Sequence, residues 1–156
     1  MATKVSNELT KLLKAVNETP ASALWDCHGT WVIKHKALEK VGAYMGLSFD
    51  MPTIIETDIK NKSVSVCVQG HRNLNVVDKD KQNKIVRISA WSFGESAPYN
   101  TTNKYPFAMA EKRAVDRVIL KLIGMHGDLY SEVEADAFQE KTQTGRRSIS
   151  ITNRGD

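Results

Sequence analysis

Three cations recur at every fourth position late in the chain: Arg113, Arg117 and Lys121. On a helix this spacing places them in one row along one face, with Ala110 and Ala114 beside them. Cations arranged in this way repel one another, whereas an Arg guanidinium group binds phosphate through two parallel hydrogen bonds. The row therefore predicts a binding site for a sugar-phosphate backbone, and the small alanines would leave room for the backbone to approach. The alternative is a cationic helix face that is simply solvated.

A second group of residues with possible chemistry precedes that helix. Residues 84–93 alternate in polarity, so Arg87, Trp91 and Phe93 share one face of a predicted strand. Aromatic rings beside cations suit the stacking of nucleic-acid bases, which contributes about 1–3 kcal/mol per base. The alternative is that Trp91 and Phe93 are buried under a helix.

Signals of catalysis are weak. The sequence has neither a G-x-x-x-x-G-K-[ST] phosphate loop nor a G-x-S-x-G nucleophile elbow. Glu56, Asp58 and Lys60 loosely resemble the core of metal-dependent nucleases, in which carboxylates hold Mg²⁺, so a nuclease stays open as a further alternative. Cysteine and histidine form no C-x-x-C or H-x-x-x-H pair. We expect no enzyme, no catalytic residue, no metal and no cofactor. The cysteine and histidine side chains within residues 27–71 that would suit a zinc ion by type are Cys27, His28, His35, Cys67 and His71, and their spacing does not indicate a zinc site.

The periodicity of apolar residues predicts the elements that must position these groups. A period of 3.6 indicates helices over 7–17, 31–45 and 105–123, and a period of 2 indicates strands over 52–59, 63–77 and 84–93. Short turns join the strands, which predicts an antiparallel meander. The expected fold class is α+β: N-terminal helices, a three-stranded antiparallel β-meander, and a long basic helix packed on the sheet as a β-β-β-α core. In that helix the apolar arc expected to face the valines of the sheet contains Phe107, Val115, Val118, Ile119 and Leu122.

Composition places the chain among ordinary globular proteins. It has 156 residues, of which 41% are hydrophobic and 26% charged, and a formal net charge of +4. We expect one domain over residues 1–138 and a flexible C-terminal tail over 139–156. There is no apolar run long enough for a membrane-spanning helix, and two cysteines are too few for a disulfide scaffold, so we expect a cytoplasmic protein without a membrane partner.

Four motifs together resemble a known family. They are Trp31-Val-Ile-Lys-His35, the predicted meander, Ala110-Glu-Lys-Arg-Ala-Val-Asp-Arg117 and Gly124-Met-His-Gly127. This combination resembles the single-strand annealing proteins of the Rad-fifty-two-like superfamily, above all the phage recombination annealing proteins related to the Red-beta and Erf types. The likeness covers residues 24–138 and is greatest over 105–136.

The resemblance implies a β-β-β-α core assembled into a homo-oligomeric ring or filament. Single-stranded DNA would then lie in a basic groove between the sheet and the long helix. Gly124 departs from the eukaryotic relatives, which have a further basic residue there. The DNA-binding residues expected from the resemblance and from the face of the third strand are Lys34, Lys36, Arg87, Trp91, Lys112, Arg113, Arg117 and Lys121.

The function expected on this basis is ATP-independent binding of single-stranded DNA and annealing of complementary strands in homologous recombination and DNA repair. The expected partners are single-stranded DNA, further copies of the chain, and a host single-strand binding protein or a partner exonuclease. If the chain is phage-encoded, the compartment is the host cytoplasm. The alternatives are a plain protective single-strand binding protein and, from another class, the metal-dependent nuclease.

Overall fold

The computed structural model describes residues 4–101 and 104–134, which form an α+β fold, as predicted. The predicted boundary at residue 138 and the predicted tail over 139–156 lie outside the described residues. None of the helices in the described part is long and apolar enough to cross a membrane. In chain order the elements are α1 (Asn7–Ala15), α2 (Pro20–Ala23), β1 (Leu24–Cys27), β2 (Thr30–Ile33), α3 (His35–Tyr44), β3 (Ser48–Phe49), β4 (Thr53–Asp58), β5 (Ser63–Val77), β6 (Asn83–Ser96), α4 (Pro106–Leu122) and β7 (Leu129–Ser131).

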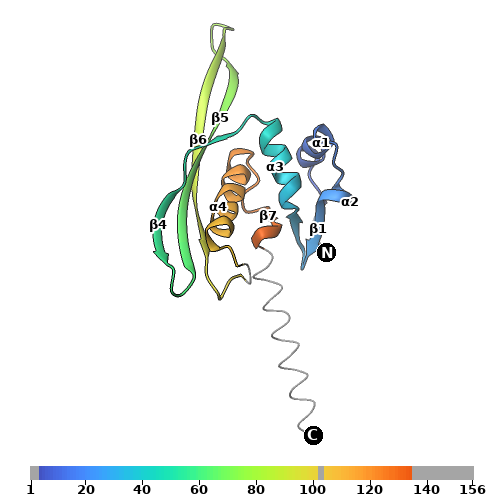
Figure 1. The fold of residues 1–156 in the computed structure, drawn as a ribbon. Coiled ribbons are helices and arrows are strands. Elements are labelled where there is room, and N and C mark those ends of the chain that lie inside the picture. Colours follow the sequence, from blue (N-terminus) through green and yellow to red (C-terminus); the bar gives the residue numbers. More distant parts are fainter. Residues whose placement is uncertain (1–3, 102–103, 135–156) are drawn as a thin grey trace.

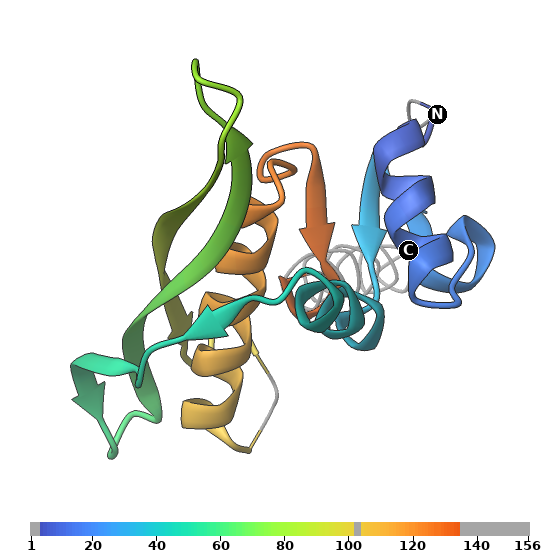
Figure 2. The same ribbon diagram turned by 90° about the horizontal axis from the view of Figure 1, so that it is seen from above.

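The larger sheet is the predicted meander with one short addition. β5 pairs antiparallel with β4 on one edge and with β6 on the other, and β3 pairs with β5 next to β4. Strict alternation in β5 buries Val64, Val66 and Val68 on the side that faces α4. Beyond this covered part, β5 and β6 continue as a long two-stranded ribbon (Figure 1). The opposite face of the sheet carries no covering element among the described residues (Figure 2).

A second, small sheet corrects the prediction of a helix over 31–45. Residues 30–33 form β2, which pairs antiparallel with β1 and parallel with β7. The positive φ angles of His28 and Gly29 make a tight hairpin turn that returns the chain onto β1. Helix α3 therefore begins only at His35, with Lys34 as its N-cap.

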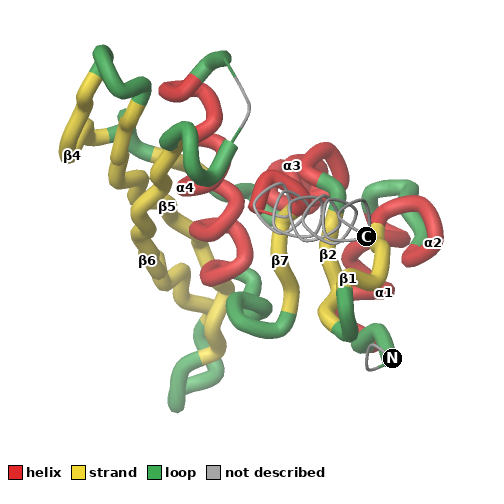
Figure 3. The backbone as a smooth tube through the Cα atoms, turned by 90° about the horizontal axis from the view of Figure 1, so that it is seen from below, coloured by secondary structure: helices red, strands yellow, loops and turns green. Residues whose placement is uncertain are grey.

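Helix α4 lies between two layers and is covered on both sides. The larger sheet packs on one side of it, and α3, β7 and α1 lie on the other (Figures 1 and 3). Ala110 and Ala114 are fully buried against the valines of β5, whereas Ile119 and Leu120 join the core formed with α1 and α3. Val115 and Val118 pack toward the sheet, as predicted. The prediction is wrong for the alanines, because they also face the sheet and leave no space for a polymer. Phe107, predicted to be core, is 44% exposed.

The close approach of α4 to β6 depends on Gly94. A Cβ atom at this position would lie 2.0 Å from the carbonyl oxygen of Ala110 and 2.6 Å from the backbone nitrogen of Ala114. Backbone atoms cannot rotate away as a side chain does, so a methyl group would push the helix off the sheet. The contact therefore requires a glycine at position 94 of β6, opposite the small residues Ala110 and Ala114 of α4.

Replacing Gly94 with alanine is expected to lower the free energy of unfolding by roughly 2–3 kcal/mol, the upper range for overpacking a core. Gly70→Ala is the matched control on the paired strand, because its Cβ would meet the side chains of Val118 and Phe49 rather than backbone. Denaturant unfolding of both variants measures the difference. Equal stabilities for the two variants would contradict this account of the helix contact.

Candidate nucleic-acid interface

The row of cations on α4 caps the outer edge of β6. Lys121 Nζ donates to the carbonyl oxygen of Trp91 (2.8 Å), and Arg117 Nη1 donates to that of Phe93 (2.7 Å). Arg113 Nη1 completes the series with the carbonyl oxygen of Glu95 (2.9 Å). Two spacings make this match possible: four helical residues rise about 6 Å and two strand residues about 6.6 Å. The row thus protects the edge of β6 that pairs with no strand of the described part of the chain, one of the uses of cations at edge strands.

Arg113 is an interior residue, and its predicted role as a DNA contact is wrong. Only 2% of it is exposed, which leaves no surface for a phosphate. Its Nε donates to the carbonyl oxygen of Val133 (3.0 Å), and its guanidinium also donates to the side chain and carbonyl of Asn100 (2.9 and 2.7 Å). These bonds join the middle of α4 to the end of β6, to the loop between β6 and α4, and to the segment after β7. Arg113 therefore stabilises the fold.

Arg117 is half-buried and neutralised by two carboxylates, so the predicted open row is wrong here too. Glu95 and Glu134 both form ion pairs with its Nη2. Burial opposes the charged guanidinium, but the hydrogen bonds to Glu95 and the charge of Glu134 outweigh it and raise the pKa of Arg117. In return, the hydrogen bond from Arg117 lowers the pKa of Glu95. Arg117 closes the β6 edge and is not free for a phosphate.

The outer face of β6 exposes two aromatic rings. Trp91 is 51% exposed and Phe93 is 47% exposed, so neither lies under a helix. Their ring centroids are 5.2 Å apart in an edge-to-face arrangement. Lys121 reaches around the edge of the sheet, and its Nζ lies 5.7 Å from the centroid of the Trp91 ring, within the range of a cation–π contact. This group combines exposed aromatic area with a positive charge.

Polar side chains continue the outer face along the ribbon. The register places Gln69 opposite Trp91 and Asn73 opposite Arg87, all on the face of the aromatic pair. Arg87 is exposed and lies about 13 Å from Trp91 along the strand, at about 3.3 Å per residue. Amide groups can donate to and accept from base edges, and Arg87 can bind phosphate. We name Arg87, Trp91, Phe93, Lys121 and these two amide residues the outer-face site.

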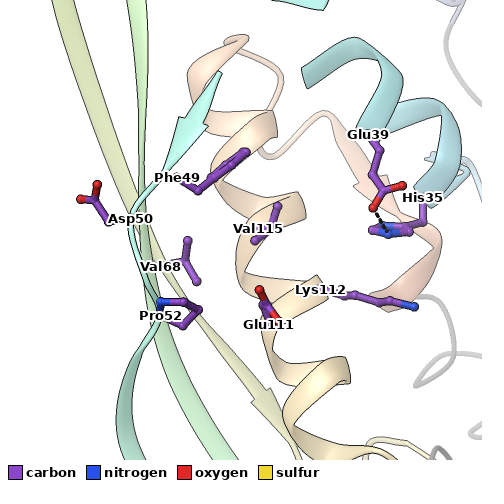
Figure 4. A pocket seen from close by; sticks show the side chains of 9 residues that line it. All are labelled: His35, Glu39, Phe49, Asp50, Pro52, Val68, Glu111, Lys112 and Val115. Carbon is purple, nitrogen blue, oxygen red and sulfur yellow. Dashed lines mark ion pairs between the residues drawn. The ribbon is translucent and has the colours of Figure 1, made fainter. Parts of the chain in front are cut away.

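The remaining predicted cations do not join this site. Lys34 and Lys36 are exposed at the start of α3, on the other side of α4 from the sheet (Figure 1). Lys112 is exposed on α4 and points toward the end of α3 that carries His35 (Figure 4). The structure thus divides the predicted set into an outer-face group, a structural pair and a group around α3.

A cavity of about 370 Å³ lies between α3, α4 and the β3–β4 connection (Figure 4). Its apolar lining comes from Phe49, Pro52, Val68 and Val115. Charged groups line the rest: His35, Glu39, Asp50, Glu111 and Lys112. Because three carboxylates and only one lysine and one histidine line the cavity, it is poorly suited to bind a phosphate chain.

A buried polar network missed at the sequence level lies behind this cavity. Asp116 is fully buried and accepts hydrogen bonds on its Oδ2 from His35 Nδ1 (2.8 Å) and Ser131 Oγ (2.5 Å). His35 Nε2 forms an ion pair with Glu39 (2.9 Å). The hydrogen bond to Asp116 raises the pKa of His35, and burial raises the pKa of Asp116. The sequence does not indicate this network. Asp116 follows Arg113 by three residues, and this spacing of opposite charges is typical of an exposed helix face.

Stability is expected to fall as the pH rises above 6.5, the ordinary pKa of histidine. A pKa raised in the folded state contributes stability that is complete below the unfolded value and is lost through the folded value, at about 1.4 kcal/mol per pKa unit. Asp116 changes stability in the same direction, because its folded pKa is also raised. Thermal unfolding between pH 6 and 9 measures the loss, which should be smaller in the His35→Gln variant, because only Asp116 then contributes. An equal fall in that variant would assign the effect elsewhere.

The alternative metal sites are not assembled in the part of the chain that the structure describes. Asp58 accepts hydrogen bonds from the backbone and side chain of Asn61, so it caps the β4–β5 turn. His71 bonds to Asp50 and Ser89, and His35 belongs to the Asp116 network. Within residues 4–101 and 104–134 no three His, Cys, Asp or Glu side chains are grouped to hold a metal ion. These residues do not support the nuclease alternative.

Comparison of the chain with protein-family models, with curated proteins and with solved structures found no match.

Proposed function

We propose that the protein binds single-stranded DNA on the outer-face site and, as a homo-oligomer working without ATP, promotes annealing of complementary strands in recombination. The observation that carries the proposal is the pair of exposed rings, Trp91 and Phe93, with Lys121 beside them on an uncovered sheet face. Exposed apolar groups that adjoin one another mark interaction sites, whereas single scattered ones are common on any surface. A nucleotide would suit this site, because its base can stack on the rings and its phosphate is attracted to Lys121.

The geometry of the site suits annealing as well as binding. Stacking uses the flat faces of the bases and leaves their hydrogen-bonding edges open to a second strand. Arg87 and Lys121 reduce the repulsion between the two phosphate backbones, and contacts to phosphate carry no sequence information. Several copies on one strand would make weak contacts collectively tight.

The resemblance in the long helix extends the proposal from binding to recombination. Within that helix, Arg113 and Arg117 have structural roles in this chain, so the proposal rests on the sheet face in place of the groove. The partners proposed on the resemblance alone are a host single-strand binding protein or an exonuclease.

Two measurements on the full chain test this proposal. Fluorescence anisotropy with a labelled oligo(dT) strand should show binding that weakens with salt, with a log–log slope of about −0.7 per phosphate neutralised. Annealing of two dye-labelled complementary oligonucleotides without nucleotide should be faster with the protein than without it. Binding without faster annealing would favour the plain protective role, and absence of binding would overturn both.

A further inference from the structure

A serine, a histidine and an aspartate form a hydrogen-bonded group in the middle of the outer face of the larger sheet. His71 of β5 lies directly opposite Ser89 of β6, and the distance between His71 Nδ1 and Ser89 Oγ is 2.7 Å. On the other side of the ring, His71 Nε2 lies 3.0 Å from both carboxylate oxygens of Asp50. Asp50 belongs to the segment between β3 and β4, so only the fold brings the three residues together. We name Asp50, His71 and Ser89 the outer-face triad.

The fold holds the triad in place while it leaves the serine accessible. The backbone N–H of Asp50 donates to the carbonyl oxygen of Gln69 (2.9 Å), which anchors Asp50 beside β5. The carboxylate of Asp50 points away from α4 (Figure 4). The His71 side chain is 11% exposed, whereas Ser89 is exposed on the face that no described element covers. A well-packed histidine beside an accessible hydroxyl group is the arrangement that a nucleophilic serine requires.

The hydrogen bonds of the triad determine where its protons lie. A carboxylate can only accept hydrogen bonds, so in the neutral ring His71 Nε2 carries the hydrogen that Asp50 accepts. In that tautomer Nδ1 is an acceptor, and it accepts the hydrogen of the Ser89 hydroxyl group. Ser89 is therefore paired with a general base, and Asp50 holds that base in the required tautomer. The two ring nitrogens have exchanged the roles that they have in serine proteases, which leaves the path of the proton intact.

We propose that the outer-face triad hydrolyses carboxylic esters that carry an anionic group. Arg87 lies two residues from Ser89 on the same face of β6, about 6.6 Å along the strand, and its guanidinium group can bind the anion. Gln69 lies diagonally across from Ser89, within reach of a long side chain, and its amide N–H can donate to the oxyanion. This proposal departs from the sequence-based expectation of a protein without a catalytic residue. It is independent of the proposed function, because the reaction involves no nucleic acid.

The reaction proceeds through an acyl-serine. Ser89 Oγ attacks the ester carbonyl carbon and forms a C–O bond while its proton passes to His71 Nδ1. The bond from that carbon to the alcohol oxygen then breaks, and Nδ1 returns the proton to the leaving alcohol. Water attacks the acyl group and gives a proton to Nδ1, which passes it to Oγ as the bond between Oγ and the acyl carbon breaks. Ester and water thus yield carboxylic acid and alcohol, and Asp50, which acts through His71, is a positioning residue.

Labelling of the full chain with a fluorophosphonate, a reagent that phosphonylates nucleophilic serines, tests the proposal. Mass spectrometry should locate one phosphonyl group on the β6 peptide that contains Ser89, and the Ser89→Ala and His71→Gln variants should lose it. Ser65→Ala is the matched control and should keep it. Ser65 lies on the same face of the sheet, but its partner on β6 is Glu95 in place of a histidine.

Hydrolysis of 4-nitrophenyl esters measures catalysis and the substrate class. The unaltered protein should release nitrophenolate faster from the hemisuccinate ester than from the acetate ester, and Arg87→Gln should remove this preference. Ser89→Ala should lower kcat/KM for the hemisuccinate by about 100-fold or more. Asp50→Asn should lower kcat by about tenfold or more with KM little changed, as expected of a residue that positions the base.

Either of two results would overturn the proposal. One is a fluorophosphonate adduct that is absent from Ser89 or as frequent on Ser65. The other is hydrolysis of the hemisuccinate at the same rate in Ser89→Ala as in the unaltered protein. Equal rates on the two esters, both abolished by Ser89→Ala, would support the triad and overturn the assignment of an anionic substrate.

Discussion

Replacing Arg113 with alanine is expected to destabilise the protein by about 3 kcal/mol or more, because each buried acceptor left without a donor costs about 1–3 kcal/mol. The guanidinium supplies four hydrogen bonds to three separate segments, and its removal leaves those acceptors buried without donors. Chemical denaturation of the purified variant measures this loss.

Lys112→Ala is the matched control for this prediction. Lys112 is the neighbouring cation in the sequence, but it is exposed, and a surface substitution of this kind changes stability by about 0.5 kcal/mol or less. If Arg113→Ala were as stable as Lys112→Ala and had lost affinity for DNA, the cations of α4 would be a binding groove after all.

Replacing Trp91 with alanine is expected to weaken binding of oligo(dT) by about 5- to 150-fold, which corresponds to the 1–3 kcal/mol of one stacked base. The effect on folding should be small, because half of the side chain is exposed. Anisotropy titrations at fixed salt measure the affinity, and thermal unfolding of the same sample measures the stability.

Two variants separate stacking from a general loss of aromatic surface. Trp91→Phe retains a ring on which a base can stack and should bind within a few-fold of the unaltered protein. Tyr99→Ala removes a ring that is 80% exposed in the loop between β6 and α4 and is not part of the outer-face site, so it should bind normally. Equal affinity of Trp91→Ala and Tyr99→Ala would refute the assignment of Trp91.

The strands of the larger sheet could be predicted from sequence because their alternation is strict. The valines of β5 and the polar residues between them leave only one register that buries the apolar face. The same argument correctly placed Trp91 and Phe93 on one face and the long helix on the valine face. The close approach of α4 could not be predicted, because it depends on Gly94, whose missing Cβ lets the backbone of α4 come near.

The small sheet could not be predicted because its strands are short and depend on distant partners. Trp31, Val32 and Ile33 fit a helix or a strand equally well over so few residues, and β7 pairs with them from almost a hundred residues away. The cations of α4 were misinterpreted for a related reason. Their spacing on the helix is visible in the sequence, whereas its match to alternate carbonyl groups of β6 exists only in the folded chain.

Ultraviolet cross-linking of the full protein to oligo(dT), followed by mapping of the cross-linked peptides, tests the central claim most directly. The outer-face site predicts that the principal cross-links fall on the β6 peptide with Trp91 and Phe93 and disappear in the Trp91→Ala, Phe93→Ala double variant. Principal cross-links on α3 or on the exposed face of α4 that persist in that variant would contradict it.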